Sequence, residues 1–502
     1  MNKLKKLLQL IDSASLKNQW LLISLGIVSI ACCLFSPTVW SVLIAVVISV
    51  RIFFTKNKSC YLVFLAFISV MVVRSYFMEQ AALTVEQSTI TQLVIYPSQA
   101  KVNGNQYTGI AYTQQNQAVA FSAVISSEEE KEKLEQLEEP ILVTGTFEMI
   151  KPEAARNQYG FNYQQFLWSK SIRVQVFIKQ IASITKHTSF FSFIEEWKMK
   201  LYHYIQHIPY SLVSSYSLAL LLGDKSQIDG EALRDFKQLG ILHLLVISGL
   251  HITIMSQLVL KLLWRIGCPR EWSFCIVSVL LVVYGELVNW GVSSTRAILM
   301  MVFALMCRLF VWKQVSSMDR FAIVMLMAVI VQPTIFLSSS FVLSYGMSGC
   351  VLVTGYLFRL WDKNWQTQLS KIIYMSLCSV MLLAPLFFEV NIIAGVLTVI
   401  CSWGLAVVLL PLLVVNLVGF GIIGELTELL LTMLEQGIHW LNTIQPFRVI
   451  IGHGTFYWWG LYGVLLLFLG LFIEQKHSFV KQCTCICSLL FILVMIPYRF
   501  EE

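Results

Sequence analysis

The chain has few charged residues. Only 13% of its 502 residues are Asp, Glu, Lys or Arg, whereas 57% are hydrophobic, and an average soluble domain carries about 25% charged residues. Apolar runs recur along the chain at lengths of about 17–25 residues, and such a run spans a bilayer as one helix. The composition therefore excludes an ordinary soluble protein and predicts a polytopic α-helical membrane protein.

Cysteine is absent between Cys60 and Cys268. The largest soluble segment lies in this interval, so no disulfide can stabilise it. The twelve cysteines lie in or beside apolar runs, apart from a cluster at Cys483, Cys485 and Cys487. Their alternate spacing is not the CxxC spacing of a zinc site, so we expect buried small hydrophobic side chains and neither a metal nor a cofactor.

A nucleotide-binding motif is also missing. The loop Leu222-Gly-Asp-Lys-Ser226 superficially suggests a phosphate loop, but it lacks the earlier glycine of GxxxxGK[ST], which occurs nowhere in the chain. The sequence therefore contains no recognisable nucleotide-driven motor. Asp224 and Lys225 either form a simple turn or line a polar path.

The N-terminal 77 residues predict a membrane anchor of three spans, near 20–36, 38–54 and 60–77. The Lys-rich start shows no cleavage site after a short apolar core, so we expect it to be retained. Basic residues at the start and at 51–58 place the N-terminus in the cytoplasm of a cell-membrane protein, because cytoplasmic loops collect Lys and Arg. The third span then delivers residues 78–190 to the extracytoplasmic side.

Residues 78–190 predict a small extracytoplasmic β domain. Alternating and β-branched residues indicate five short strands, with the acidic run at 128–139 as a solvated helix or loop: 93–96, 106–112, 118–125, 141–149 and 172–178. Five strands with an inserted helix fit an OB-like β-barrel. Residues 191–235 then predict an amphipathic helix along the membrane interface, followed by a linker.

Residues 236–450 predict a large membrane core, followed at 451–502 by two C-terminal spans near 455–473 and 482–497. We expect about 10–13 membrane segments in all, since a span needs ~20 apolar residues. Within 392–445 one run is either a full crossing or a re-entrant segment, which is tolerated where it lines a cavity. Basic residues in alternate gaps indicate the cytoplasmic loops.

The stretch Phe236 to His251 combines an apolar run with two histidines and a Ser248-Gly249 pair. Ionisable and helix-breaking residues are costly at membrane depth and often mark a pathway. We expect Ser248-Gly249 to interrupt the helix between His243 and His251. The histidines are then either packed and hydrogen-bonded or part of a polar path, and a metal site is the least favoured alternative.

Ser293-Ser-Thr-Arg296 opens a later apolar run. Ser and Thr are good helix N-caps, and a guanidinium in the first turn creates an anion site, although Arg296 could instead reach a lipid headgroup. Ser344, in the stripe of small residues at 341–349, is either a helix-packing residue or a second lining residue.

In the β domain, the segment 152–167 combines a cation with spaced aromatic residues. Arg156, Asn157, Phe161 and Tyr163 are the candidate binding residues, because aromatic rings and Arg suit stacking on the bases of single-stranded DNA. A structural loop that seals the barrel is the alternative.

Four stretches together resemble the ComEC family, the membrane channels of natural transformation. They are Arg156-Asn157 to Leu167; Ala219-Leu-Leu-Leu-Gly-Asp-Lys225; Phe236 to His251; and Ser294-Thr-Arg-Ala297 with Pro333 and Phe341 to Ser344. The resemblance implies that the chain passes single-stranded DNA across the cytoplasmic membrane. It also implies that His243, Ser248, Gly249, His251, Arg296, Ser344, Asp224 and Lys225 belong to the DNA path.

The chain departs from the family pattern in three respects. Asn162 replaces an expected Asp, and Thr398 and Trp403 stand where a later Asn and Pro are expected. There is also no HxHxDH motif of the metallo-β-lactamase-like domain that most members carry. The resemblance therefore implies a channel without enzymatic activity, either truncated or served by a separate nuclease. Other implied partners are a DNA receptor on the outer side, a cytoplasmic helicase-like ATPase and a second copy of the chain in a homodimer.

Two other classes of function fit the residues. A small-solute transporter would show paired broken helices in repeated halves. An intramembrane hydrolase would use His243, His251 and Asp224, and bound zinc would favour it.

Overall fold

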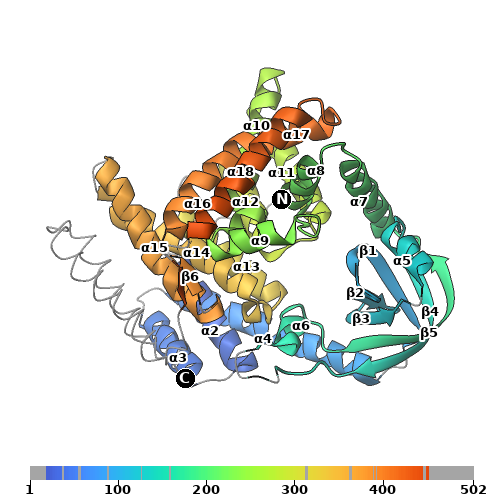
Figure 1. The fold of residues 1–502 in the computed structure, drawn as a ribbon. Coiled ribbons are helices and arrows are strands. Elements are labelled where there is room, and N and C mark those ends of the chain that lie inside the picture. Colours follow the sequence, from blue (N-terminus) through green and yellow to red (C-terminus); the bar gives the residue numbers. More distant parts are fainter. Residues whose placement is uncertain are drawn as a thin grey trace, which may run out of the picture. The chain divides into compact units, whose positions relative to one another are not determined.

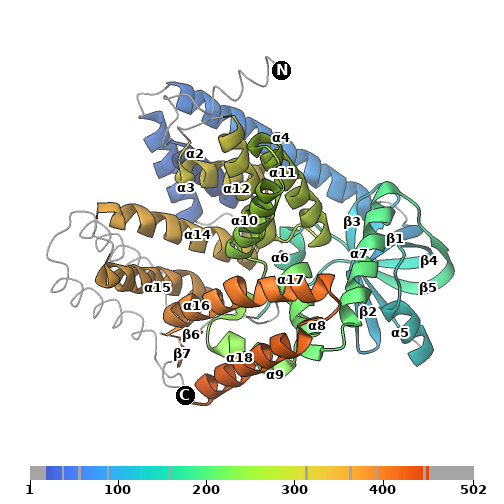
Figure 2. The ribbon, with the colours of Figure 1, turned by 90° about the horizontal axis from the view of Figure 1, so that it is seen from above.

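The computed structural model describes residues 19–450, except 37–38, 55–57, 88–89, 126, 156, 158–159, 311–314, 361–363, 388, 392 and 445–447. The expected C-terminal spans after residue 450 lie outside this part. The chain divides into two compact units, one of residues 1–204 and 307–338, the other of residues 205–306 and 339–502. Each unit is described by itself (Figures 1 and 2).

In the first unit, four apolar helices pack together: α2 (Trp20–Phe35), α3 (Val39–Phe53), α4 (Lys58–Gln87) and α13 (Ser317–Val331). Gly26 of α2 permits the close approach, because a Cβ there would lie 2.7 Å from the ring of Phe64 and 3.2 Å from Ile52. Small residues serve this purpose in membrane helices. Helices cover the three expected N-terminal spans, and the third continues ten residues beyond the expected end, to Gln87.

The β domain of this unit is a closed five-stranded barrel of order β1-β2-β3-β5-β4, with α5 (Glu128–Glu135) between β3 and β4 in the chain (Figure 1). Its strands are β1 (Gln92–Asn103), β2 (Gln106–Thr113), β3 (Ala118–Val124), β4 (Ile141–Ile150) and β5 (Gln175–Lys186). Only the β3–β5 pair is parallel. Alternate residues such as Leu93, Ile95 and Val176 fill the barrel core, which confirms the expected small barrel.

Helix α7 (Phe190–Gln206) lies against this barrel with its polar face (Figure 1). Glu195 Oε1 accepts a 2.7 Å hydrogen bond from the Ser98 N–H, and Lys198 Nζ donates to Ser98 Oγ at 3.1 Å. The opposite face exposes Phe193 and Trp197. This arrangement leaves the aromatic face available, and its position at a membrane interface stays a prediction.

The short helix α6 (Tyr163–Ser169) connects the barrel to the end of α13. Gln332, the C-cap of α13, donates its side-chain N–H to the Ser169 carbonyl, and Gln165 Nε2 donates to Leu337 O at 3.5 Å. Leu337 ends a single 3₁₀ turn, η3 (Ile335–Leu337). The barrel is thus held to the end of α13 and the η3 turn by two side-chain amides.

The second unit contains most of the expected membrane core. Its α-helices are α8 (Ser211–Ser217), α9 (Gly230–Gln238), α10 (Gly249–Arg265), α11 (Arg270–Leu287), α12 (Val292–Leu309), α14 (Ser339–Leu357), α15 (Trp365–Phe387), α16 (Ala394–Trp403), α17 (Leu410–Val418) and α18 (Gly424–Ile444). Two π-helices, η1 (Leu218–Leu222) and η5 (Gly404–Leu409), and two 3₁₀ turns, η2 (Leu242–Leu245) and η4 (Phe358–Leu360), adjoin them. The strands β6 (Glu389–Asn391) and β7 (Arg448–Ile450) form a two-stranded sheet. Most of α12 lies in this unit, and its last turn belongs to the first.

Two groups of helices organise the second unit. Helices α10, α11 and α12 share a core that includes Ile252, Leu281 and Ile298, and Figure 2 shows them side by side. Helix α18 lies beside α8, where the Glu428 carboxylate accepts hydrogen bonds from the Leu212 and Val213 N–H groups. A carboxylate at a helix N-terminus is stabilising because it satisfies otherwise unbonded N–H donors.

Five helices of the described residues are long and apolar enough to cross a membrane: Lys58–Ala82, Leu242–Arg265, Val292–Leu309, Ser339–Leu357 and Ala394–Val418. Three shorter apolar helices accompany them, at Trp20–Phe35, Ser41–Phe53 and Ser211–Leu222. The chain is therefore a multi-pass helical membrane protein with a small barrel. The expected total of about 10–13 segments stays a prediction.

Candidate functional site: a break in the membrane core

The interruption expected at Ser248-Gly249 is present. The chain passes from the 3₁₀ turn η2 through extended residues and starts α10 at Gly249. Ser248 is the N-cap, and its Oγ accepts a 3.4 Å hydrogen bond from the His251 N–H. In return, His251 Nδ1 accepts a 3.4 Å bond from the Ser248 N–H, so His251 completes a capping box in the position usually held by Glu or Gln.

The two histidines consequently have different surroundings. His251 is only 4% exposed, and a ring nitrogen that accepts a hydrogen bond carries no proton, so the ring proton lies on Nε2. His243 lies in the η2 turn and is exposed. Packing and capping therefore account for His251, whereas His243 is the histidine that can meet a ligand.

We expect Ser248→Ala to lower the free energy of unfolding by about 1 kcal/mol, because α10 would lose its N-cap. Thermal unfolding of the purified chain in detergent measures this change. Ser256→Ala is the matched control, since Ser256 is buried in the same helix and its Oγ only donates to the Ile252 carbonyl, at 2.6 Å. Equal destabilisation by both substitutions would contradict the capping role.

The loop after η1 adds a cation beside this break. The π-helix ends at Gly223, whose φ of +81° is in the left-handed region that favours glycine. Asp224 stabilises the following turn, because its Oδ2 accepts a 2.8 Å bond from Ser226 Oγ. Lys225 is half-buried, and burial lowers its pKa from the ordinary value. Asp224 is thus a turn residue, and Lys225 is the loop's ligand-binding candidate.

Arg296 lies in the first turns of α12 and contacts Ser344 of α14. Its Nε donates a 2.8 Å hydrogen bond to Ser344 Oγ, and its Nη1 lies 3.9 Å from the Met300 sulfur. In the described part of the chain it forms no ion pair with a carboxylate. A half-buried guanidinium bonded only to neutral groups keeps its charge available to an anion.

The starts of α10 and α12 lie side by side. A Cβ added at Gly249 would lie 4.0 Å from the Ala297 Cβ, an ordinary van der Waals distance, so the two first turns are near neighbours. Free N–H groups and the helix dipoles make both ends electropositive. Ser248, Gly249, His251, Arg296 and Ser344 thus belong to one region, in which neutral groups and one guanidinium surround two helix starts.

The sequence left two roles open for the stripe of small residues at 341–349, which are helix packing and the lining of a path. Gly346 and Ser344 of this stripe make different contacts. A Cβ at Gly346 would lie 2.8 Å from Leu382 Cδ1, so Gly346 packs α14 against α15. Ser344 instead accepts from Arg296 through its Oγ, and its carbonyl accepts from Ser348 Oγ at 2.8 Å. Gly346 is therefore a helix-packing residue, and the lining role expected of Ser344 stays a prediction.

In the barrel unit, α6 and the residue before its N-cap carry an exposed aromatic group that we call the α6 platform: Phe161, Tyr163 and Phe166. The Phe161 and Phe166 ring centroids are 5.6 Å apart, and the Tyr163 ring stacks on Phe166 at 6.3 Å with an interplanar angle of 25°. Burial raises the pKa of Tyr163, so its hydroxyl is neutral. Asn157 is exposed in a turn, and Arg156 lies outside the described residues.

Sequence reasoning missed the cations that accompany the α6 platform. Lys170 Nζ lies 4.7 Å from the Phe166 ring centroid, and the Arg173 guanidinium lies 4.3 Å from the Trp168 ring. The helical spacing of four residues between Phe166 and Lys170 is the signal that could have found the first pair. Asn162 caps α6 by accepting from the Gln165 N–H at 3.0 Å, so it performs the capping task available to an Asp.

In the described residues, no group of three or more His, Cys, Asp or Glu side chains is placed to hold a metal ion.

Residues 220–476 match the family described as Competence protein. The chain belongs to the ComEC competence family. ComE operon protein 3 of Bacillus subtilis (strain 168) is 22% identical over 512 residues, which cover 97% of this chain and 64% of that relative. The chain thus spans 64% of the length of this curated relative. No solved structure matches the chain.

The family match confirms the resemblance seen in the sequence and separates the two regions described above. Asp224, Lys225, His243, His251, Arg296 and Ser344 all lie inside the matched Competence segment, whereas the α6 platform precedes it. The break in the membrane core is therefore part of the ComEC family domain.

Proposed function

We propose that the chain passes single-stranded DNA across the cytoplasmic membrane in natural transformation. The observation that carries this proposal is the Arg296 guanidinium, which lies near two adjacent helix starts and is bonded to the neutral Ser344. Such a group binds phosphate without a competing carboxylate. Family membership supports DNA as the anion that passes.

The orientation that we propose puts the barrel outside the cell and the basic helix ends inside. Lys58 begins α4 and Arg320 lies in the first turn of α13, whereas α6 of the barrel attaches at Gln332, beyond the opposite end of α13. Because Lys and Arg collect on the cytoplasmic side, the barrel end faces outward. The α6 platform then receives the strand before the membrane core passes it.

A photocrosslinking experiment tests the path. A benzoylphenylalanine placed at Ser348, one turn beyond Ser344 on α14, should form covalent adducts with labelled DNA during uptake. The control position is Leu280 on α11, whose side chain is 49% exposed. Equal labelling at the two positions, or none at Ser348, would remove this face of α14 from the path.

The channel needs an energy source from another protein, and we propose a cytoplasmic helicase-like ATPase. Each phosphate that enters a negative cell interior costs about 2.3 kcal/mol per 100 mV, and the chain has no phosphate-loop motif. We expect uptake of labelled DNA to be abolished in cells without such ATPases. Uptake that persists there would show that the channel needs no cytoplasmic motor.

A DNA receptor on the outer side, a separate nuclease and a homodimer are the remaining partners that we propose.

A small-solute transporter is the second candidate. The π-helices at Leu218–Leu222 and Gly404–Leu409 interrupt two apolar helical stretches of the same unit, and transporters use interrupted helices at their binding sites. Membrane-inserted protein that fails to pass DNA under all conditions would favour this candidate.

A further inference from the structure

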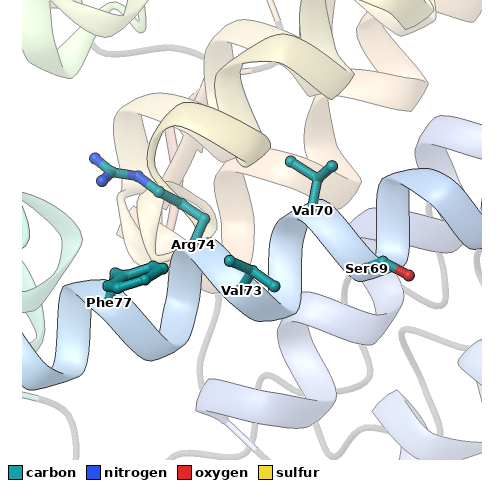
Figure 3. Close-up of a pocket in the computed structure, with 5 residues that line it drawn as sticks. All are labelled: Ser69, Val70, Val73, Arg74 and Phe77. Atoms are coloured by element: carbon teal, nitrogen blue, oxygen red, sulfur yellow. The ribbon is translucent and has the colours of Figure 1, made fainter.

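A pocket lies on one face of α4, at the level of the outer part of this helix. Ser69, Val70, Val73, Arg74 and Phe77 line it, and its volume is about 410 Å³ (Figure 3). These residues form two adjacent rows at i, i+4 spacing, which lie side by side on a helix. All five are exposed, whereas Cys60, Phe64 and Met71 of α4 are buried.

This face of α4 belongs to a membrane-spanning helix. The span Lys58–Ala82 has a mean hydropathy of 1.9, and only 17% of it is buried inside the protein. Arg74 follows Lys58 by 16 residues, which corresponds to roughly 24 Å along a helix, in a hydrocarbon core about 30 Å thick. The guanidinium is therefore close to the headgroup level opposite Lys58.

Arg74 is fixed in place by the end of α13. Its Nε donates a 3.3 Å hydrogen bond to the Val331 carbonyl in the last turn of that helix. Figure 3 shows the two terminal nitrogens extending away from α4. No described carboxylate forms an ion pair with Arg74, and a guanidinium has further N–H donors on these nitrogens.

We propose that this pocket binds an anionic phospholipid. One acyl chain would occupy the apolar face of Val70, Val73 and Phe77, and the phosphate would accept hydrogen bonds from the terminal nitrogens of Arg74. The guanidinium fork matches phosphate oxygens, and a cation at headgroup level is stabilised by an anionic partner. An anionic headgroup fits better than a zwitterionic one, because it brings no second cation next to Arg74.

The site has a consequence for the barrel. The α13 end that holds Arg74 through Val331 continues into Gln332 and Leu337, to which α6 is hydrogen-bonded. A lipid bound at Arg74 would therefore lie at the junction of α4, α13 and α6. This inference does not depend on what passes through the membrane core.

Native mass spectrometry and thermal unfolding of the full chain in mild detergent test the proposal. We expect phosphatidylglycerol to remain bound and to raise the unfolding temperature more than phosphatidylcholine does. Arg74→Gln should weaken phosphatidylglycerol binding about tenfold, the value of a lost charged hydrogen bond. Arg51→Gln, in the last turn of α3, should leave binding unchanged.

A second variant keeps the test decisive if Arg74→Gln does not fold. Val73→Trp fills the pocket and retains the guanidinium, and it should also release the bound lipid. Equal binding of the two lipids by the wild type, or unchanged phosphatidylglycerol binding in Val73→Trp, would overturn the proposal. Loss of a dimer in Val73→Trp without any change in bound lipid would assign the pocket to a second copy of the chain and would overturn it as well.

Discussion

Arg296→Ala should reduce DNA uptake by about one to two orders of magnitude while the amount of protein in the membrane stays unchanged. The substitution removes the guanidinium near the two helix starts, and a hydrogen bond to a charged group contributes about 1.5–3 kcal/mol. The loss should stay within the range of a single such bond, because conduction requires weak contacts from which the strand can dissociate. Uptake of labelled DNA by competent cells measures the effect.

Two further variants assign this effect to the guanidinium. Arg296→Lys keeps the charge but cannot keep the geometry of the Nε bond to Ser344, so we expect an intermediate loss. Arg308→Ala is the control, since Arg308 is an exposed cation in the last turn of the same helix. Normal uptake with Arg296→Ala, or an equal loss with Arg308→Ala, would remove Arg296 from the DNA path.

Combined replacement of Phe161 and Phe166 by Ala should weaken binding of single-stranded DNA about 100-fold. Each exposed ring offers one stacking surface, and stacking on a base contributes about 1–3 kcal/mol. Fluorescence anisotropy with a labelled oligothymidine and the purified full chain measures the affinity. It should be done at low salt, because phosphate contacts weaken with ionic strength.

A matched pair of aromatic residues exists on α7 of the same unit. Phe193 and Trp197 are 59% and 60% exposed, and their ring centroids are 6.1 Å apart. Their combined replacement by Ala should leave DNA affinity unchanged if the α6 platform is the binding surface. Comparable losses in the two double variants would indicate nonspecific adsorption to aromatic residues.

The barrel could be predicted from the sequence because alternation of apolar residues determines which strand face is buried. The expected first strand ended at Tyr96, whereas β1 continues to Asn103. Pro97 follows the expected end directly and falls where the register of β1 against β2 shifts between Ile95 and Ala100, and prolines are tolerated at bulges. A proline that ends a strand and one that marks a bulge look alike in the sequence.

The break at Ser248-Gly249 was predictable because a good N-cap followed by glycine has a local physical meaning. The role of His251 was not predictable, because its ring accepts the Ser248 N–H only when α10 starts at Gly249. The Arg296–Ser344 bond joins residues 48 positions apart, and no local pattern encodes such a contact. Long-range pairs of this kind decide which of several polar residues form a site.

The most direct test of the central claim is complementation. A competent host that lacks its own channel would receive this 502-residue chain, and labelled DNA protected inside the cytoplasm would be measured. We predict protected label, with a further increase if a DNA-degrading domain is supplied as a separate chain. Membrane-inserted protein that admits no DNA with or without that domain would contradict the account and favour the small-solute transporter.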